Sequence, residues 1–143
     1  MDIPALFNET PFVQLLDIEV TMAEDGRAAG TMTFSEKLCS NVDASVAHGG
    51  ATYALADTLG GAAVISLAED VTPTVDMRID YLAPVTSDVT AHAEVIRFGS
   101  NLAMVRVEMH DDDGTKVATA HGTYKTGGQT ADTPWKPETD HSQ

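Results

Sequence analysis

The chain has 143 residues, of which 43% are hydrophobic, and its 22 Asp and Glu face only eight Lys and Arg, a formal net charge of −14. This length fits one domain with a single core and leaves no room for a second catalytic domain. So acidic a surface repels nucleic acid and anionic membranes, and neither is an expected partner. The acidic residues are spread along the chain, a pattern typical of salt-loving organisms, where high ionic strength screens the repulsion.

The N-terminus and the cysteine content favour a cytoplasmic protein. Residues Met1–Pro4 lack the basic region and apolar run of an export signal. Cys39 is the only cysteine, which excludes an internal disulfide, and an inert thiol is its expected role. The longest weakly polar stretch, residues 44–68, contains His48 and Asp57 and is a poor candidate for a membrane span.

The first third of the chain predicts a lead-in and a β-hairpin. Pro4–Leu16 is interpreted as a short helical or irregular segment. Polar and apolar residues alternate over Ile18–Met22, which predicts a strand, and Asp25–Gly26 is a hairpin signal before a return strand over Ala28–Phe34. Ser35–Ala47 is a polar connection without a clear period.

The next segment predicts one long central helix. Ala51–Leu67 is rich in Ala and Leu, lacks Pro and follows His48-Gly49-Gly50. The segment is apolar nearly all round, so we expect a buried helix with the sheet curled around it.

After Pro73 the hydrophobic period drops to two, which predicts four further strands. Their cores are Val75–Tyr81, Val89–Val95, Val105–Met109 and Val117–Tyr124. Because the connections are short, we expect antiparallel pairing of successive strands.

Together these elements predict an α+β fold, in which an antiparallel sheet of about six strands wraps around one long helix. A single domain should cover residues 1–125. Residues 126–143 are polar and rich in Gly, Pro and Thr, so we expect a disordered C-terminal tail.

One constellation could carry chemistry. Asp57 is the only carboxylate between residues 44 and 68, and an ionised carboxylate is costly in so apolar a helix unless it is paired or hydrogen-bonded. It is either a base or nucleophile, or a side chain that faces water or a partner's backbone. Gly49 and Gly50 lie at the positive end of the helix dipole, where free N–H groups suit an oxygen that gains charge. These glycines could equally serve only a tight turn.

The spacing of Gly49 and Asp57 bears on how they could cooperate. Asp57 is eight residues after Gly49, and so about 12 Å farther along the helix axis. Groups that far apart cannot easily act on one reacting carbon. If both are catalytic, they should come from different subunits, and a twofold dimer would then hold two sites.

The run His48–Thr58 resembles the hot-dog thioesterases of the phenylacetic-acid-degradation (PaaI-like) and 4-hydroxybenzoyl-CoA thioesterase type. That family has a His-Gly-Gly turn followed by a hydrophobic helix with an acidic residue at this spacing. Thr74–Val85 resembles the strand that follows the helix in the family, and the turn at Arg97–Gly99 and the hairpin at Asp112–Ala118 also fit. The resemblance covers roughly Leu15–Lys125.

The resemblance implies hydrolysis of an acyl-CoA thioester and assigns roles to five residues. Asp57 would act as general base or nucleophile, and the Gly49 N–H would bind the thioester oxygen. His48 would help to hold the turn and the carbonyl, Asn41 would orient water or substrate, and Thr74 would supply a hydroxyl from the next strand. For the last three, the alternatives are a loop-packing histidine, a turn-forming asparagine and an ordinary strand threonine.

The expected partners are the acyl-CoA substrate and further copies of the chain, as a homodimer or a dimer-of-dimers homotetramer. No metal and no cofactor are expected beyond the CoA of the substrate, since the remaining histidines show no metal spacing. Arg97, Arg106 and Lys116 are candidates to bind the CoA phosphates. The alternative functions are a hot-dog dehydratase acting on a hydroxyacyl thioester and a non-catalytic protein that binds acyl-CoA.

Overall fold

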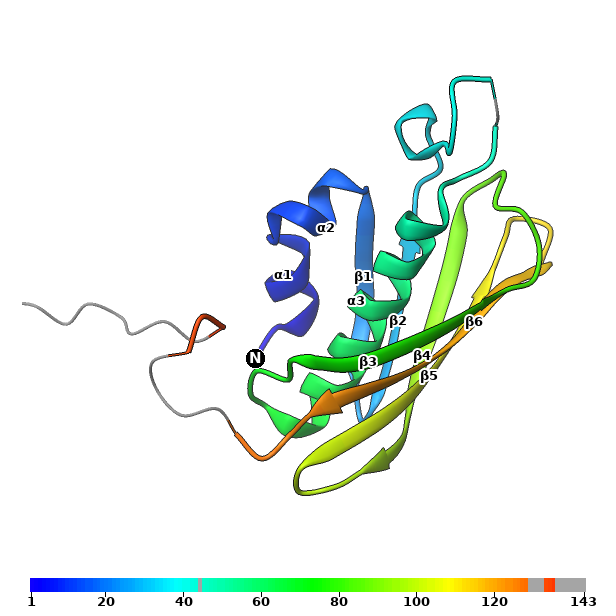
Figure 1. The fold of residues 1–143 in the computed structure, drawn as a ribbon. Helices are drawn as coiled ribbons and strands as arrows, with labels where there is room; N and C mark the ends of the chain where they lie inside the picture. Colours follow the sequence, from blue (N-terminus) through cyan, green and yellow to red (C-terminus); the bar gives the residue numbers. More distant parts are fainter. Residues whose placement is uncertain (44, 129–132, 136–143) are drawn as a thin grey trace, which may run out of the picture.

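The computed structural model describes residues 1–43, 45–128 and 133–135. A six-stranded sheet curves around one long helix, and two short helices lie beside it (Figure 1). The helices are α1 (Ile3–Asn8), α2 (Pro11–Leu15) and α3 (Gly49–Ala68). The strands are β1 (Ile18–Glu24), β2 (Arg27–Met32), β3 (Thr74–Tyr81), β4 (Val89–Phe98), β5 (Leu102–His110) and β6 (Lys116–Lys125). The α+β architecture expected from the sequence is confirmed, while most of the predicted tail lies outside the described residues.

Helix α3 is the centre of the core. Leu55, Leu59 and Val64 are fully buried where the helix packs against the sheet, and α1 covers part of its other side. By length and composition α3 could cross a membrane, but 56% of its apolar stretch is buried inside the fold, which is the packing of a core helix. Burial on nearly all sides was expected, yet Tyr53 is 37% exposed and Asp57 is half-buried. One flank of α3 is therefore only partly covered, although Tyr53 and Asp57 on this flank are hydrogen-bonded to β3.

The strand order in the sheet is β1-β2-β4-β5-β6-β3, and all neighbours are antiparallel. The hairpin at Asp25–Gly26 is confirmed, with both residues at the positive φ angles that a two-residue β-turn requires. The expectation that successive strands pair is wrong for β3 and β4. The connection between them carries the chain past β6 and β5, so that β4 pairs with β2 instead and β3 forms one edge of the sheet.

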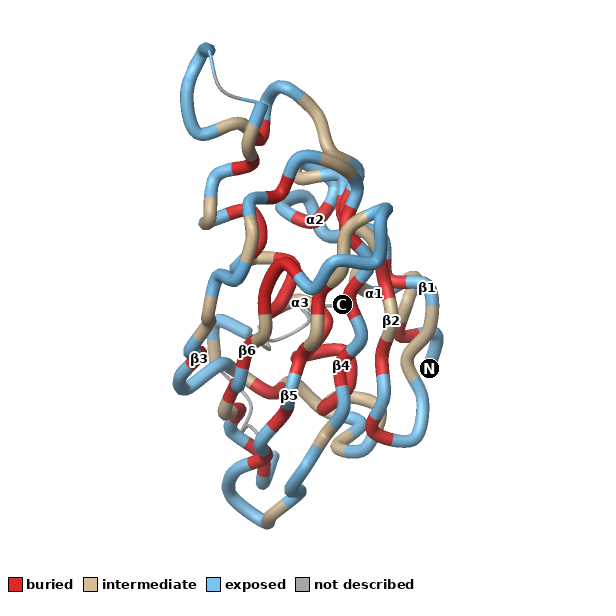
Figure 2. Tube along the Cα trace, turned by 90° about the vertical axis from the view of Figure 1, so that its right-hand side faces the viewer, coloured by how far each residue is buried: buried red, intermediate tan, exposed pale blue. Residues whose placement is uncertain are grey.

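The two faces of the sheet differ as the alternating pattern predicts (Figure 2). Side chains toward α3 are apolar and buried: Val89, Ala91, Ala93, Val105, Val107 and Met109. The intervening residues of β4 and β5 are mostly polar, and they lie on an outer face that is open to solvent.

Strand β3 departs from the predicted pattern. Met77 is buried and Ile79 is half-buried, as expected, but Val75 is 59% exposed and Tyr81 is 53% exposed. The reason is that β3 pairs only with β6, so its other edge has no neighbouring strand in the described part of the chain. The apolar side chains of Val75 and Tyr81 are therefore exposed along this edge.

Candidate active site

The carboxylate of Asp57 is held by two hydroxyl groups. Its Oδ1 accepts a hydrogen bond from Thr74 Oγ1 at 2.7 Å and another from the Tyr124 hydroxyl at 2.9 Å. Thr74 begins β3 and Tyr124 lies near the end of β6, and the two residues are paired in the sheet register. Two adjacent strands thus present their hydroxyls to one carboxylate oxygen. These bonds offset the cost of placing a carboxylate in an apolar helix.

Sequence reasoning did not single out Tyr124, which the structure places against Asp57. Its side chain is 1% exposed, and its hydroxyl is also 2.9 Å from the backbone oxygen of Asp57. Burial, and then the nearby charge of Asp57, hold the pKa of Tyr124 well above its usual value, so the hydroxyl stays protonated and serves as a donor. A polar aromatic residue at an inward position of the last strand was the available signal, because a buried tyrosine hydroxyl usually has a partner.

His48 caps the N-terminus of α3. It has extended backbone angles, and its Nδ1 accepts a hydrogen bond from the Gly50 N–H at 2.8 Å. The backbone N–H of His48 donates to the carbonyl of Leu38, and this bond connects the turn to the preceding loop. The imidazole therefore holds the turn, and its contact with a substrate carbonyl stays a prediction.

Gly49 opens onto a surface hollow of about 440 Å³. Tyr81 lines the same hollow and donates its hydroxyl proton to the Gly49 carbonyl at 2.7 Å. A Cβ at Gly49 would lie 3.0 Å from the Tyr81 ring, so a glycine fits this position best. Within the described residues, the N–H of Gly49 donates no hydrogen bond, and Asp57 does not line the hollow.

Asn41 lies in the exposed loop before α3. Its Oδ1 accepts a hydrogen bond from the Asp43 N–H at 2.9 Å, an arrangement typical of an Asx turn. The structure thus shows a turn-forming contact for Asn41, and its expected role toward water or substrate stays a prediction.

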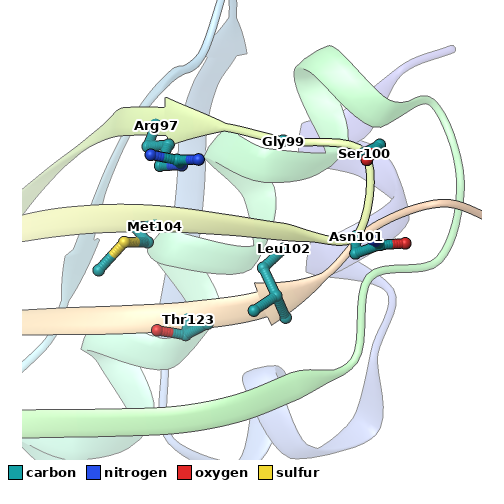
Figure 3. Close-up of a pocket in the computed structure, with 7 residues that line it drawn as sticks. All are labelled: Arg97, Gly99, Ser100, Asn101, Leu102, Met104 and Thr123. Carbon is teal, nitrogen blue, oxygen red and sulfur yellow. The ribbon is translucent and has the colours of Figure 1, made fainter.

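The three cations suggested for the CoA phosphates lie on the outer face of the sheet. Lys116 is 2.6 Å from a carboxylate oxygen of Glu108, and Arg106 lies 3.9 Å from Glu94. Arg97 lines an outer-face hollow of about 470 Å³ with Leu102, Met104 and others (Figure 3). Because α3 covers the opposite face, these cations point away from Asp57.

The arrangement provides the parts for attack on a polarised carbonyl. A fixed carboxylate suits a base or nucleophile, and a free N–H at a helix N-terminus suits a developing oxyanion. Among the described residues, no group of three or more His, Cys, Asp or Glu is placed to hold a metal ion.

Comparisons with known proteins place this chain in a family. Residues 44–118 match the model of the Thioesterase superfamily. The medium/long-chain acyl-CoA thioesterase YigI of Salmonella typhimurium is 28% identical over 133 residues, which cover 82% of this chain and 86% of YigI.

Solved structures agree with this result. The PaaI protein of Escherichia coli, from the phenylacetic acid degradation operon, has a TM-score of 0.80 at 25% identity, covering 88% of this chain and 91% of PaaI. Thioesterase HI1161 of Haemophilus influenzae has a TM-score of 0.77 at 25% identity, covering 87% of each chain. The chain thus has the hot-dog fold, belongs to the thioesterase superfamily and is a thioester hydrolase.

Proposed function

We propose that this chain hydrolyses acyl-CoA thioesters to the free acid and CoA, with Asp57 as general base or nucleophile and the Gly49 N–H binding the thioester oxygen. The observation that carries the proposal is the Asp57 carboxylate, fixed in an apolar helix by Thr74 and Tyr124. The substrate class follows from the similarity to YigI, a medium/long-chain acyl-CoA thioesterase.

The chemistry needs one base or nucleophile and one donor. As a general base, Asp57 would take a proton from water while the water oxygen adds to the thioester carbon. As a nucleophile, it would add directly and form an acyl anhydride that water then cleaves. In either route the carbonyl oxygen becomes negative and is stabilised by the Gly49 N–H, after which the C–S bond breaks and the CoA thiolate takes up a proton.

The two groups belong to different subunits in this proposal. They are separated by about 12 Å along α3, and the hollow beside Gly49 does not include Asp57. Strand β3 is connected to both groups. Thr74 at its beginning bonds Asp57, and Tyr81 at its end bonds Gly49.

Antiparallel pairing of two β3 edges would bring the two halves of the site together. With a twofold axis between Met77 and Arg78, Thr74 lies opposite the partner's Tyr81, so that Asp57 approaches the partner's Gly49. The exposed Val75 and Tyr81 would be covered in the same step. Doubling of this dimer to a tetramer, a cytoplasmic location and adaptation to high salt are parts of the same proposal. Sedimentation in high salt tests the assembly, and a stable, active monomer would contradict the shared site.

The test is release of thiol from a panel of aryl, short-, medium- and long-chain acyl-CoA, followed with a thiol reagent in molar KCl. Asp57→Asn keeps the size of the side chain and removes its charge, so we expect kcat to fall about 10²-fold or more while the dimer persists. Asp112→Asn, the same change in an exposed hairpin, is the matched control and should keep wild-type activity.

The outcomes separate the proposal from other functions. Full activity in Asp57→Asn would rule out the proposed mechanism. Binding of acyl-CoA without thiol release by the wild type would indicate a binding protein, and loss of water from a hydroxyacyl-CoA without thiol release would indicate a dehydratase.

A further inference from the structure

The two oxygens of the Asp57 carboxylate have different surroundings. Oδ1 accepts from both Thr74 and Tyr124, at 2.7 and 2.9 Å. Within the part of the chain that the structure describes, Oδ2 accepts no hydrogen bond and has no ion pair. The fold thus holds Oδ1 by hydrogen bonds and leaves Oδ2 available to react.

We infer that Tyr124 is a positioning residue for the reaction, which together with Thr74 holds Oδ1 and reserves Oδ2 as the oxygen that reacts. This inference rests on the proposed role of Asp57. Tyr124 acts through Asp57 and touches no substrate in this scheme, so its contribution is the orientation of the carboxylate.

Three glycines line the space that the Tyr124 side chain occupies. A Cβ at Gly60 would lie 2.5 Å from the hydroxyl oxygen, one at Gly122 would lie 3.0 Å from the ring, and one at Gly61 would lie 3.6 Å from it. Any side chain at Gly60 would push the hydroxyl away from Asp57, which is three residues earlier on the same face of α3. Gly60 and Gly122 therefore leave the space in which the tyrosine reaches the carboxylate.

The two donors differ in how well water can replace them. Thr74 is exposed, so a water molecule can take the place of its hydroxyl when the side chain is changed. Tyr124 is 1% exposed, and no bulk water reaches the position of its hydroxyl. Removal of the buried donor loses a hydrogen bond that water cannot restore, which costs more than removal of an exposed donor. Tyr124 should therefore influence the carboxylate more than Thr74 does.

The experiment compares the separate values of kcat and KM in three variants. In Tyr124→Phe we expect kcat to fall about tenfold with KM within about twofold, because the carboxylate loses a donor that fixes its orientation. Thr74→Val should lower kcat less. Tyr53→Phe is the matched control. Its hydroxyl bonds the Met77 carbonyl instead of the carboxylate, so kcat should stay at the wild-type value.

A second variant keeps the test valid if Tyr124→Phe folds poorly. Site-specific 3-fluorotyrosine at position 124 retains the hydroxyl and makes it a stronger donor, and Gly61 and Gly122 line the ring edges beside that hydroxyl. This substitution should keep kcat within about twofold of the wild-type value, because the donor to the carboxylate is retained. An unchanged kcat in folded Tyr124→Phe, or a tenfold loss of kcat with 3-fluorotyrosine, would overturn the inference. If either result is found and Asp57→Asn is inactive in the same assay, only the inference about Tyr124 is contradicted and the proposed function stands. Full activity in Asp57→Asn would contradict both the proposed function and the inference about Tyr124.

Discussion

The two functional parts of α3 are built in different ways. At the N-terminal end, Gly49 is placed by the adjacent cap residue His48 and by one exposed tyrosine, Tyr81, and it faces an open hollow. In the middle of the helix, Asp57 is held by hydroxyls from residues that are 17 and 67 positions away in the chain. The helix end is thus a local structure, whereas the carboxylate site depends on the register of β3 and β6.

This difference has an energetic consequence. A change in the middle of α3 disturbs close packing and buried hydrogen bonds, and it should therefore reduce stability and activity together. A change at the helix N-terminus disturbs an exposed cap, and stability should fall less than activity does.

The largest expected effect on stability is at Gly60. In Gly60→Ala the new methyl group would lie 2.5 Å from the Tyr124 hydroxyl and 3.0 Å from Val105, so we expect the free energy of unfolding to fall by about 1–3 kcal/mol. Gly61→Ala is the matched control, because its nearest neighbour is 3.6 Å away and alanine favours the helix by about 1 kcal/mol. Denaturant unfolding measures both. Equal losses of the free energy of unfolding in the two variants would contradict the proposal that Gly60 leaves space for the Tyr124 hydroxyl.

A smaller effect is expected at the helix cap. His48→Ala removes the acceptor for the Gly50 N–H and should lower the free energy of unfolding by about 1 kcal/mol. His48→Asn supplies another good cap and should recover that stability. Activity of the two variants then separates the roles of the imidazole. If His48→Asn is stable but slow, the imidazole also acts on the substrate, and if it is fully active, His48 serves only as the cap.

The smallest expected effect comes from salt, which acts on the whole surface and not on either part of α3. Fourteen net negative charges should repel one another in dilute buffer, and the ion pairs of the described residues are too exposed to offset this. Between dilute buffer and molar KCl we expect the melting temperature to rise by a few degrees, equivalent to about 1 kcal/mol or less. A flat melting temperature would contradict adaptation to salt.

The sequence was informative where local rules decide the structure. A lone carboxylate in an apolar helix and a glycine pair at the helix start made Asp57 and Gly49 candidates, and the family resemblance then assigned their roles. The alternating pattern located the strands and the inward residues of β4 and β5, because the side-chain period of a strand is independent of its neighbours.

Other features depend on contacts that no local pattern encodes. The partnership of Tyr124 with Asp57 requires the β3–β6 register, and a connection that passes two strands places β3 at the edge of the sheet. The exposure of Val75 and Tyr81 follows from that position, since alternation indicates the side of a strand on which a residue lies but not whether anything covers it.

The central claim is that one chain supplies the carboxylate and its partner supplies the glycine, and mixing two inactive variants tests it most directly. Chains with Asp57→Asn are combined with chains with Gly49→Val, whose side chain would press against the Tyr81 ring. Each heterodimer then has one site with both changes and one site with neither. A random 1:1 mixture should recover about a quarter of the wild-type kcat, since half of the dimers carry one intact site of two. Verified heterodimers that are no more active than either parent would contradict the shared site.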